Sequence, residues 1–365
     1  MNVLFRADAG NTIGHGHVMR CLTLADALRE RAVKSHFVCR DHPGNLIALI
    51  RARGHEVSVL PQQGTAAAVA EDYRTWAGAG EAEDAAQTRA ACPQKFDRVV
   101  VDHYALGAVW EKQLQRPARD LLVIDDLANR PHCAALLLDS GLQRRADDYA
   151  SLLPSGAQLL CGPGYALLAS GFAARRAATL AQRQQRTCRN LLISLGGGDS
   201  ARRIPALLPR LAGIARQHAL QLTIITGSED RSLQQPIRQA LARNALQAQL
   251  LGRVDDMPAR LAAADIAIGA AGGSAYERAC LGLPSVVLQM AENQATQLRA
   301  LQQYGAAIAI GDPTELPAAL TQVMQQHQTM QAASAALCDG LGAQRVAERL
   351  CRSGAQSDNT PETPQ

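Results

Sequence analysis

The N-terminal stretch, residues 2–28, constrains the fold most, because a strand, a glycine-containing loop and a helix follow one another there. Residues 2–5 are an apolar run typical of a buried strand, and the polar loop after it carries Gly14 and Gly16. The next residues place apolar side chains on one helix face: Val18, Leu22, Ala25 and Leu28. Such a unit directs backbone N–H groups and a positive helix end at an anion, and glycine lets the ligand approach closely. The sequence therefore predicts a ligand site at Gly14 and Gly16.

His17 lies at the start of this helix, where the helix dipole disfavours a proton on its ring. A neutral imidazole can accept a proton, so His17 is a candidate general base. Two other interpretations are a helix-capping loop with surface histidines and a metal pair formed by His15 and His17. The metal pair is disfavoured, because two histidines do not complete a site and no cysteine or carboxylate nearby has ligand-like spacing. We therefore expect no metal.

Strands and helices alternate along the whole chain, and its 365 residues suffice for about two domains. This alternation implies right-handed crossovers and parallel sheets. We predict an N-terminal Rossmann-like domain at residues 1–170, a crossover at 171–188 and a second Rossmann-like domain at 189–352. Residues 353–365 are polar and are predicted to be a disordered tail. The crossover is predicted to be a helix with a solvated basic face: Arg175, Arg176, Arg183 and Arg186.

Carboxylates end several predicted strands of the first half: Asp102, Asp125, Asp126 and Asp139. Ligands of parallel sheets bind at the carboxyl ends of the strands, so these acids are candidate contacts. A strand-ending aspartate can also be a helix cap or a turn former. The run Asp102-His103-Tyr104 places three polar groups at one strand end, and we count Asp102 and Tyr104 among the candidate substrate contacts.

The second half contains two glycine loops, each directly after a predicted strand. The first loop comprises Gly196, Gly197 and Gly198, and the second comprises Gly272, Gly273 and Ser274. Their amides and the helix starts behind them can hold an anion without a metal. A plain tight turn is the alternative for either loop.

Glu277 follows the second loop at the spacing of a capping box, Ser-x-x-Glu, which predicts local helix capping. The functional alternative is a carboxylate that accepts two hydrogen bonds from a ribose diol. Asn293 and Gln294, at the start of the next predicted helix, offer amide donors and acceptors.

Composition and missing motifs exclude several classes of protein. A net charge of +4 without dense basic runs, and only 3% aromatic residues, argue against nucleic-acid binding. No apolar run approaches membrane-spanning length, and nine scattered cysteines without a Cys-x-x-Cys indicate reduced thiols in a cytoplasmic protein. The chain has no Walker loop, no Gly-x-Ser-x-Gly and no His-Glu-x-x-His. It also lacks Asp-x-Asp, the usual metal–diphosphate motif, and we expect no cofactor.

Six segments together resemble the UDP-sugar hydrolases of pseudaminic acid biosynthesis, and the resemblance runs over roughly residues 2–311. In chain order they are FRADAGNTIGHGHVMRCLTLADAL, VVVDHYALGAVWE, VIDDLANRPH, CGPGYALL, LISLGGGD and GGSAYERACLGLPSVVLQMAENQ. More widely, the chain is similar to the glycosyltransferase B superfamily, in particular to the MurG transferases. This resemblance implies two doubly wound Rossmann-like domains that face each other across a cleft.

The resemblance also implies an activity. These hydrolases convert UDP-2,4-diacetamido-2,4,6-trideoxy-β-L-altropyranose to UDP and the free sugar, without a metal, by attack of water at the anomeric carbon with inversion. By analogy, His17 activates or orients the water, and Arg6 and Asp8 help to bind the sugar. The glycine loops would hold the diphosphate, Glu277 the ribose, and the backbone around Val254 the uracil. Asn293 and Gln294 would reach the diphosphate or the sugar.

Three functions are therefore considered: the hydrolase, a UDP-sugar-dependent glycosyltransferase with the same fold, and a non-catalytic binder of nucleotide sugars. The expected partner is a UDP-linked diacetamido-trideoxy sugar, bound by a cytoplasmic monomer with no nucleic-acid or membrane partner.

Overall fold

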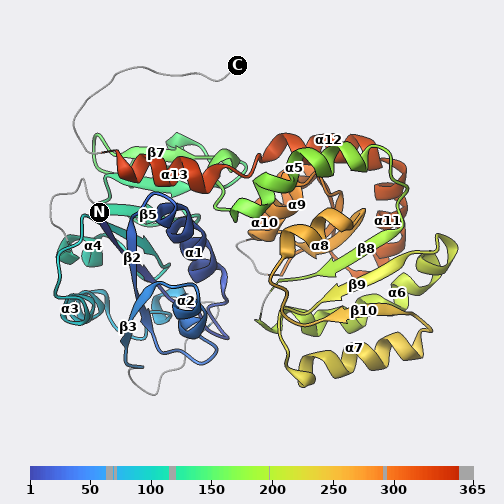
Figure 1. Cartoon of the computed structure of the whole chain (residues 1–365), viewed down its shortest axis with the longest axis horizontal. Coiled ribbons are helices and arrows are strands. Elements are labelled where there is room, and N and C mark those ends of the chain that lie inside the picture. Colours follow the sequence, from blue (N-terminus) through green and yellow to red (C-terminus); the bar gives the residue numbers. More distant parts are fainter. Residues whose placement is uncertain (63–68, 70–71, 115–120, 197, 291–293, 353–365) are drawn as a thin grey trace.

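The computed structural model describes residues 1–62, 69, 72–114, 121–196, 198–290 and 294–352. They form two lobes side by side, each built on one parallel β-sheet with helices around it (Figure 1). The predicted α/β class with two parallel sheets is confirmed. The predicted tail at residues 353–365 lies outside the described residues.

The first lobe contains a seven-stranded sheet in the order β3-β2-β1-β4-β5-β6-β7. Its strands are β1 (Asn2–Ala7), β2 (Lys34–Arg40), β3 (Glu56–Leu60), β4 (Arg98–Asp102), β5 (Leu121–Ile124), β6 (Leu136–Asp139) and β7 (Gln158–Cys161). The helices between them are α1 (Gly16–Arg29), α2 (Ile47–Ala52), α3 (Glu81–Ala91) and α4 (Ala108–Leu114). Short 3₁₀ helices span Tyr73–Thr75, Ala146–Tyr149 and Pro163–Tyr165.

The second lobe contains a six-stranded sheet in the order β10-β9-β8-β11-β12-β13. Its strands are β8 (Asn190–Ser194), β9 (Gln221–Ile225), β10 (Ala248–Leu251), β11 (Ile266–Ala270), β12 (Ser285–Leu288) and β13 (Ala307–Ile310). The helices from the crossover onward are α5 (Ser170–Arg183), α6 (Ile204–Gln217), α7 (Arg231–Arg243), α8 (Met257–Ala263), α9 (Ser274–Cys280), α10 (Ala295–Gln303), α11 (Leu316–Gln325), α12 (His327–Leu337) and α13 (Gly342–Cys351). Further 3₁₀ helices span Gly198–Arg203 and Pro313–Glu315.

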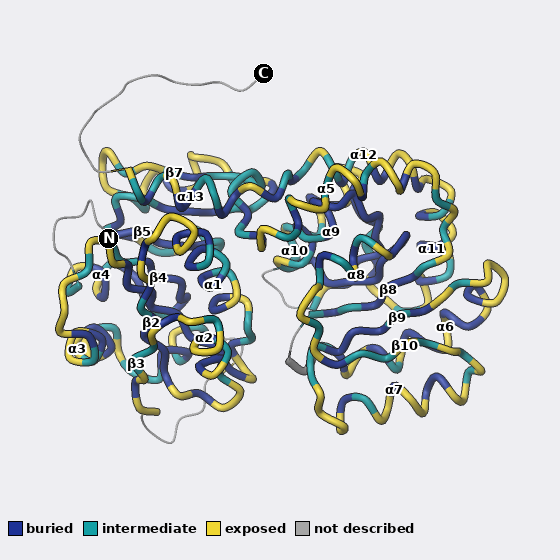
Figure 2. The backbone as a smooth tube through the Cα atoms, viewed as in Figure 1, coloured by how far each residue is buried: buried dark blue, intermediate teal, exposed yellow. Residues whose placement is uncertain are grey.

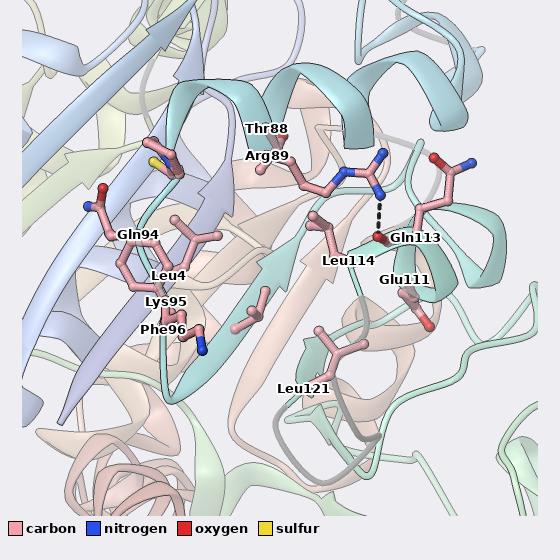
Figure 3. Close-up of a pocket in the computed structure, with 13 residues that line it drawn as sticks. Leu4, Thr88, Arg89, Gln94, Lys95, Phe96, Glu111, Gln113, Leu114 and Leu121 are labelled. Carbon is pink, nitrogen blue, oxygen red and sulfur yellow. Dashed lines mark hydrogen bonds between the residues drawn. The ribbon is translucent and has the colours of Figure 1, made fainter.

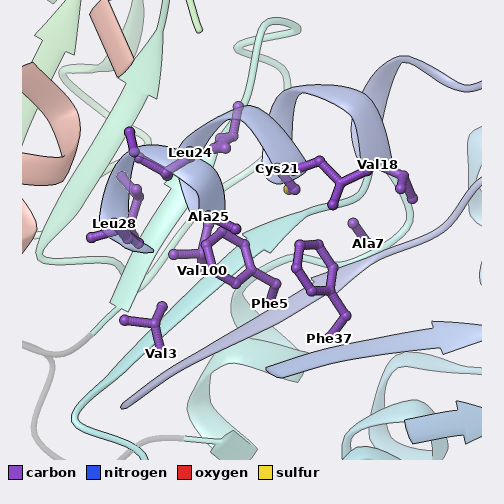
Figure 4. Packing of buried hydrophobic residues seen from close by; sticks show 14 of the residues in the cluster. Val3, Phe5, Ala7, Val18, Cys21, Leu24, Ala25, Leu28, Phe37 and Val100 are labelled. Carbon is purple, nitrogen blue, oxygen red and sulfur yellow. The ribbon is translucent and has the colours of Figure 1, made fainter. Parts of the chain in front are cut away.

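The core of the first lobe forms where α1 packs on the sheet (Figure 4). The apolar face predicted for this helix is fully buried: Val18, Leu22, Ala25 and Leu28. It lies on Phe5 of β1 and Phe37 of β2, which are neighbours in the sheet and stack with ring centroids 4.8 Å apart. This packing fixes α1, and with it the loop at its start, to the carboxyl ends of the central strands.

The strands are mostly buried inside each lobe, whereas the outer faces of helices such as α3 and α7 are exposed (Figure 2). This pattern explains why the strands are continuous apolar runs, because parallel sheets are covered by helices on both faces. All nine cysteines are free thiols. None of the helices within the described ranges has both the length and the apolar character needed to cross a membrane.

The chain crosses between the lobes twice. After α12 it returns to the first lobe, where α13 lies beside β7 and buries Val346 and Leu350 in the same core as α1 (Figure 1). A Cβ on Gly342 would lie 2.3 Å from the Ala166 carbonyl oxygen, so only glycine lets the two crossing segments approach so closely. The domain boundaries at 170, 188 and 352 stay a prediction, and α13 lies within the range predicted for the second domain.

The predicted solvated face of the crossover helix is wrong for Arg183 and Arg176. Arg183 is almost completely buried. Its guanidinium donates to backbone carbonyls that end helices α8 and α9: Leu261, Ala264 and Leu281. Arg176 donates to the Ala335 oxygen near the end of α12 at 2.7 Å. Because the last carbonyls of a helix lack partners within it, these arginines cap three helix ends and attach α5 to the second lobe.

Candidate active site

His17 and Asp102 form the centre of the candidate site. His17 lies in the first turn of α1, and Asp102 is the last residue of β4, paired in register with Ala7 at the end of β1. The two side chains meet because α1 begins at the edge where the parallel strands end. His17 Nδ1 is 2.6 Å from Asp102 Oδ1, and Asp102 is completely buried. Asp102 therefore lies behind the imidazole as its hydrogen-bond partner.

Arg20 binds the same carboxylate and is a further residue of the site, one that is not among the residues predicted from the sequence. Its Nε donates to Asp102 Oδ2 at 2.5 Å and its Nη2 to Asp102 Oδ1 at 2.7 Å, while Nη1 donates to Asp126 Oδ2 at 2.9 Å. Burial alone would raise the pKa of Asp102, but the charge of Arg20 and the hydrogen bonds hold that pKa well below its usual range. The i, i+3 spacing of His17 and Arg20 on one helix face was the available sequence signal.

The ionised carboxylate of Asp102 fixes the tautomer of His17. An ionised carboxylate can only accept hydrogen bonds, so the hydrogen between the two residues is on His17 Nδ1. The lone pair is then on Nε2, which forms no hydrogen bond with any described residue. The side chain is 7% exposed. The ring is thus oriented to accept a proton at Nε2.

The structure also bears on the two other interpretations of the loop, the capping loop with surface histidines and the metal pair of His15 and His17. His17 is buried, so it is not a surface histidine, and His15 at the N-cap position makes no capping bond with its side chain. The ring of His15 instead lies 3.3 Å from the Gly44 carbonyl oxygen. In the part of the chain that the structure describes, no group of three or more His, Cys, Asp or Glu is arranged to hold a metal.

Aromatic side chains surround His17. The ring of Tyr104 packs edge-on against it with centroids 4.5 Å apart, and the Tyr104 hydroxyl donates to Asp126 Oδ1 at 2.6 Å. Burial and the neighbouring Asp126 carboxylate raise the pKa of Tyr104 well above its usual value, so its hydroxyl keeps its proton. Trp76 lies on another side with its centroid 6.2 Å from that of His17. The candidate Tyr104 therefore belongs to the wall around the imidazole.

Arg6 and Asp8 lie in a buried layer behind this wall. Both are completely buried, and Arg6 Nη1 donates to Asp8 Oδ1 at 2.6 Å. Arg6 also binds Asp84 of α3 through Nε at 3.0 Å and Nη2 at 2.7 Å. The second oxygen of Asp8 lies 3.2 Å from His103 Nε2. A contact of Arg6 or Asp8 with a sugar stays a prediction, because the described structure engages them with protein groups.

Two further strand-end acids anchor loops of the first lobe. Asp125 accepts from Arg130 at 2.7 Å and from the Tyr149 hydroxyl at 3.0 Å. Asp139 accepts from Arg144 and from the same hydroxyl, at 2.7 Å and 2.8 Å. Each also accepts from a backbone N–H two or three residues further on, as the turn-forming interpretation predicts.

In the second lobe, Glu277 lies on the first turn of α9 and forms no hydrogen bond or ion pair with a described residue. The helix is capped by Gly273 without any side-chain bond, so the predicted capping box of Ser274 and Glu277 is wrong. Ser274 Oγ instead lies 3.2 Å from Arg278 Nη1, which donates to it. Burial raises the pKa of Glu277 to about 7, although the charge of Arg278 opposes this. A partly buried carboxylate that no described residue binds is therefore a candidate ligand contact.

Several predicted ligand glycines leave open space around them. A Cβ on Gly14, Gly16, Gly196 or Gly273 would meet no described atom within 4 Å. Gly14 and Gly196 have φ values of +80° and +103°, which L-residues rarely adopt. Gly16 and Gly273 need neither a positive φ nor tight packing, so the absence of a side chain there leaves room for an external group.

The remaining predicted contacts lie in or near the two glycine loops of the second lobe. Gln294 Oε1 accepts from the Met290 N–H at 3.1 Å, and a Cβ on Gly272 would lie 3.3 Å from Gln294 Nε2, so the structure brings these two residues together. Gly198 begins the 3₁₀ helix after β8. Gly197 and Asn293 lie outside the described residues.

Contacts between the lobes show that the carboxyl edges of the two sheets face each other. The Tyr276 hydroxyl of α9 donates to the Ser140 carbonyl oxygen after β6 at 2.6 Å. Burial lowers the pKa of His15 at the start of α1, the hydrogen bond to the Gly44 carbonyl raises it, and the charge of Arg253 in the second lobe lowers it. The candidate Val254 is next to Arg253 and packs on the core of the second lobe. The histidine and Glu277 therefore lie on the two facing edges.

A cavity of about 410 Å³ lies elsewhere in the first lobe (Figure 3). It is lined by the amino halves of β1, β4 and β5, at Leu4, Val99 and Leu121, and by residues of α3 and α4. The side chain of Arg89 lines the cavity, and its Nη1 donates to the backbone carbonyl oxygen of Gln113 at 2.7 Å. Because His17 lies at the carboxyl ends of these strands, the cavity is not part of the candidate active site.

Comparisons with known proteins agree with this architecture. The glycosyltransferase family 28 C-terminal domain matches residues 191–350. The chain is 24% identical to the spore coat polysaccharide biosynthesis protein SpsG of Bacillus subtilis, over 85% of this chain and 84% of that protein. It is 27% identical to the UDP-2,4-diacetamido-2,4,6-trideoxy-β-L-altropyranose hydrolase of Campylobacter jejuni, over 47% of this chain and 53% of that protein.

Among solved structures, MurG of Acinetobacter baumannii superimposes with a TM-score of 0.64 and 17% identity, covering 96% of this chain and 98% of that one. This likeness confirms the predicted fold, two Rossmann-like domains of the glycosyltransferase B type.

Proposed function

We propose that this protein hydrolyses UDP-2,4-diacetamido-2,4,6-trideoxy-β-L-altropyranose to UDP and the free sugar. The observation that carries the proposal is the His17–Asp102 pair, in which a buried carboxylate lies 2.6 Å from Nδ1 and Nε2 has no hydrogen bond to any described residue. The named likeness to the Campylobacter jejuni hydrolase supports the choice of substrate and reaction. The match of the second lobe to the family 28 domain supports a nucleotide sugar as the ligand.

In the proposed reaction, His17 Nε2 accepts a proton from water as the water oxygen bonds to the anomeric carbon. The bond from that carbon to the diphosphate oxygen breaks, and its electron pair leaves with UDP. Asp102 stabilises the imidazolium that forms, as an oriented carboxylate does for a general base. Attack from the face opposite to the leaving group inverts the anomeric carbon.

UDP is a good leaving group once its negative charge is stabilised. We assign this stabilisation to the backbone around the glycines that leave open space. Gly16 begins α1 and Gly273 directly precedes α9, so each lies at the positive end of a helix dipole. Fixed backbone dipoles of this kind stabilise developing charge without reorganisation. We place the diphosphate at Gly273 and the sugar near Gly16.

Glu277→Gln is expected to weaken UDP binding by about tenfold to a hundredfold, because hydrogen bonds to a charged group contribute roughly 1.5–3 kcal/mol. In the unbound protein the pKa of Glu277 is raised to about 7, so its carboxylate is mostly protonated below that pH. Binding through the ionised form should therefore tighten by about tenfold between pH 6 and pH 8. Isothermal titration calorimetry with UDP at both pH values checks this.

Glu30→Gln is the matched control, since Glu30 is exposed at the far end of α1. UDP itself titrates in this range, so the informative quantity is the pH dependence that wild type shows and Glu277→Gln lacks. If Glu277→Gln and wild type bound UDP with equal affinity and equal pH dependence, Glu277 would not be a ribose contact.

A glycosyltransferase is the second candidate, favoured by the family 28 match over residues 191–350. Incubation with the UDP-sugar alone separates the two, because the hydrolase releases UDP without an acceptor. In ¹⁸O-labelled water the label is expected in the sugar and not in UDP. UDP release that needs an added acceptor would favour the transferase, and label in UDP would mean attack at phosphorus.

A further inference from the structure

We propose that Arg20 is a positioning residue that holds Asp102 behind His17 and places a positive charge beside the imidazole of the proposed base. The inference rests on the proposed function, in which His17 accepts a proton. It assigns to Arg20 two effects: the guanidinium holds Asp102 in place, and its positive charge beside the imidazole opposes protonation of the ring.

The contacts of Arg20 suit this role. It holds both oxygens of Asp102, at 2.5 Å and 2.7 Å, and reaches Asp126 at 2.9 Å with its remaining nitrogen. Its Nη2 lies 3.3 Å from His17 Nδ1. Because that ring nitrogen already carries the hydrogen given to Asp102, it cannot accept another from Arg20. The contact is therefore a close approach of a cation to the ring.

Other charged and titratable groups also face the His17 imidazole, and the effect of the Arg20 charge has to be considered together with theirs. From β4 and the residues after it come the Asp102 carboxylate, the neutral phenol of Tyr104 and the ring of His103, whose centroid is 6.5 Å away. Burial lowers the pKa of His103, which favours its neutral form. From α1 come Arg20 and Cys21, whose thiol is 3.7 Å from Asp102. Asp102 would favour an imidazolium, and Arg20 is the cation that opposes it.

A second observation shows that Arg20 is held rather than free to swing away. Its side chain is 23% exposed, and Asp126, which it binds, also accepts the Tyr104 hydroxyl at 2.6 Å. Tyr104 in turn packs on His17. Contacts therefore run from Arg20 to Asp126, from Asp126 to Tyr104 and from Tyr104 to the imidazole. Asp102 and Asp126 together fix the guanidinium of Arg20.

The test is the pH dependence of kcat/KM for UDP release by wild type, Arg20→Met and Arg20→Lys. Methionine removes the charge and leaves Asp102 less neutralised, and both changes favour a protonated ring. The midpoint of the acidic limb should therefore move to higher pH by about one unit, the usual effect of one nearby charge. Lysine keeps the charge but not the forked geometry, so its limb should stay close to that of wild type while kcat falls.

Arg29→Met is the matched control, because Arg29 lies on the same helix and pairs with the half-buried Asp26, at 2.9 Å, away from His17. Its profile should equal that of wild type. If Arg20→Met loses activity but the midpoint of the acidic limb of kcat/KM does not move to higher pH, the role of Arg20 is structural. That result overturns the proposal. Circular dichroism confirms that each variant is folded.

A readout without turnover keeps this inference separate from the proposed function. If wild type releases no UDP, the proposed function fails, but the protonation of His17 can still be followed by NMR of its ring, assigned with His17→Asn. An upward shift of the titration midpoint in Arg20→Met supports the role of Arg20. An unchanged or lower midpoint contradicts it.

Discussion

Replacement of His17 by asparagine is expected to lower kcat for UDP release by about 10²–10⁴-fold, the usual contribution of a positioned general base. Asparagine can place an N–H near the position of Nδ1, so the hydrogen bond to Asp102 can be kept, but it offers no basic nitrogen at the position of Nε2. The buried carboxylate is then still partnered, and the fold should be preserved. Steady-state release of UDP measures the loss, and calorimetry with UDP should show little change in affinity.

His36→Asn is the control for this substitution. His36 is a partly buried histidine of β2 that bonds Glu56 and Ser58, at 3.0 Å and 2.9 Å, on the same sheet but away from α1. We expect its kcat to match wild type. Undiminished turnover by His17→Asn would falsify the assignment of His17 as the base. A fall in both UDP affinity and thermal stability would instead indicate a structural role.

The sequence predicts the elements around His17 well because their signals are local. The apolar face of α1 recurs at helical spacing, and the central strands are apolar runs that end in carboxylates. Parallel topology then brings strand ends to one edge, so His17 and Asp102 could be expected near each other. That they touch depends on the register of β4 with β1, which no local pattern encodes.

The parts that the sequence did not predict depend on long-range packing. β7 is a four-residue edge strand with an irregular pattern of burial, so its residues lack a clear strand signal. Arg183 reads as an exposed basic residue, yet it is buried because the ends of α8 and α9 present bare carbonyls to it. α13 packs in the core of the first lobe, although in the chain it follows all the strands of the second lobe. In each case the partner is distant in sequence.

Arg6 and Asp8 illustrate the same limit within the site. Arg6 lies in β1 and Asp8 follows two positions later, just beyond the end of that strand, so alternation along the chain places both side chains on one face of the sheet. Which face carries α3 depends on residues 62–91, an alanine-rich, polar stretch in which the sequence does not distinguish helix from loop. The structure places Asp84 of α3 over Arg6, and this burial could not have been foreseen.

This covered layer leads to the second large effect, on stability. Asp84→Asn is expected to lower the free energy of unfolding at pH 7 by about 3–5 kcal/mol, the usual result of removing one partner from a buried ion pair. Asp84 accepts from Arg6 at 2.7 Å and from Arg40 at 2.7 Å, and all three side chains are completely buried. It also accepts from the Trp110 indole at 2.9 Å. Asparagine removes the charge that two guanidinium groups share and turns an N–H toward one of them.

Glu348→Gln is the matched control, since Glu348 pairs with Arg352 on the exposed face of α13 and such surface pairs contribute little. Urea unfolding monitored by circular dichroism should leave its midpoint unchanged, while that of Asp84→Asn falls clearly. An equal midpoint for Asp84→Asn and wild type would mean that the arginines are satisfied without the Asp84 charge.

The pH dependence of the stability of Asp84→Asn tests independently whether the charge of Asp84 stabilises the fold. Burial would raise the pKa of Asp84, but the charges and hydrogen bonds of Arg6 and Arg40 lower it to about 2, from an ordinary value of 3.8. A depressed pKa contributes stability that is complete above about pH 4 and is lost as the pH falls toward 2. The stability difference between wild type and Asp84→Asn should therefore be largest at neutral pH and shrink below pH 4. A difference that stays constant from pH 7 to pH 3 would show that packing around residue 84, rather than its charge, stabilises the first lobe.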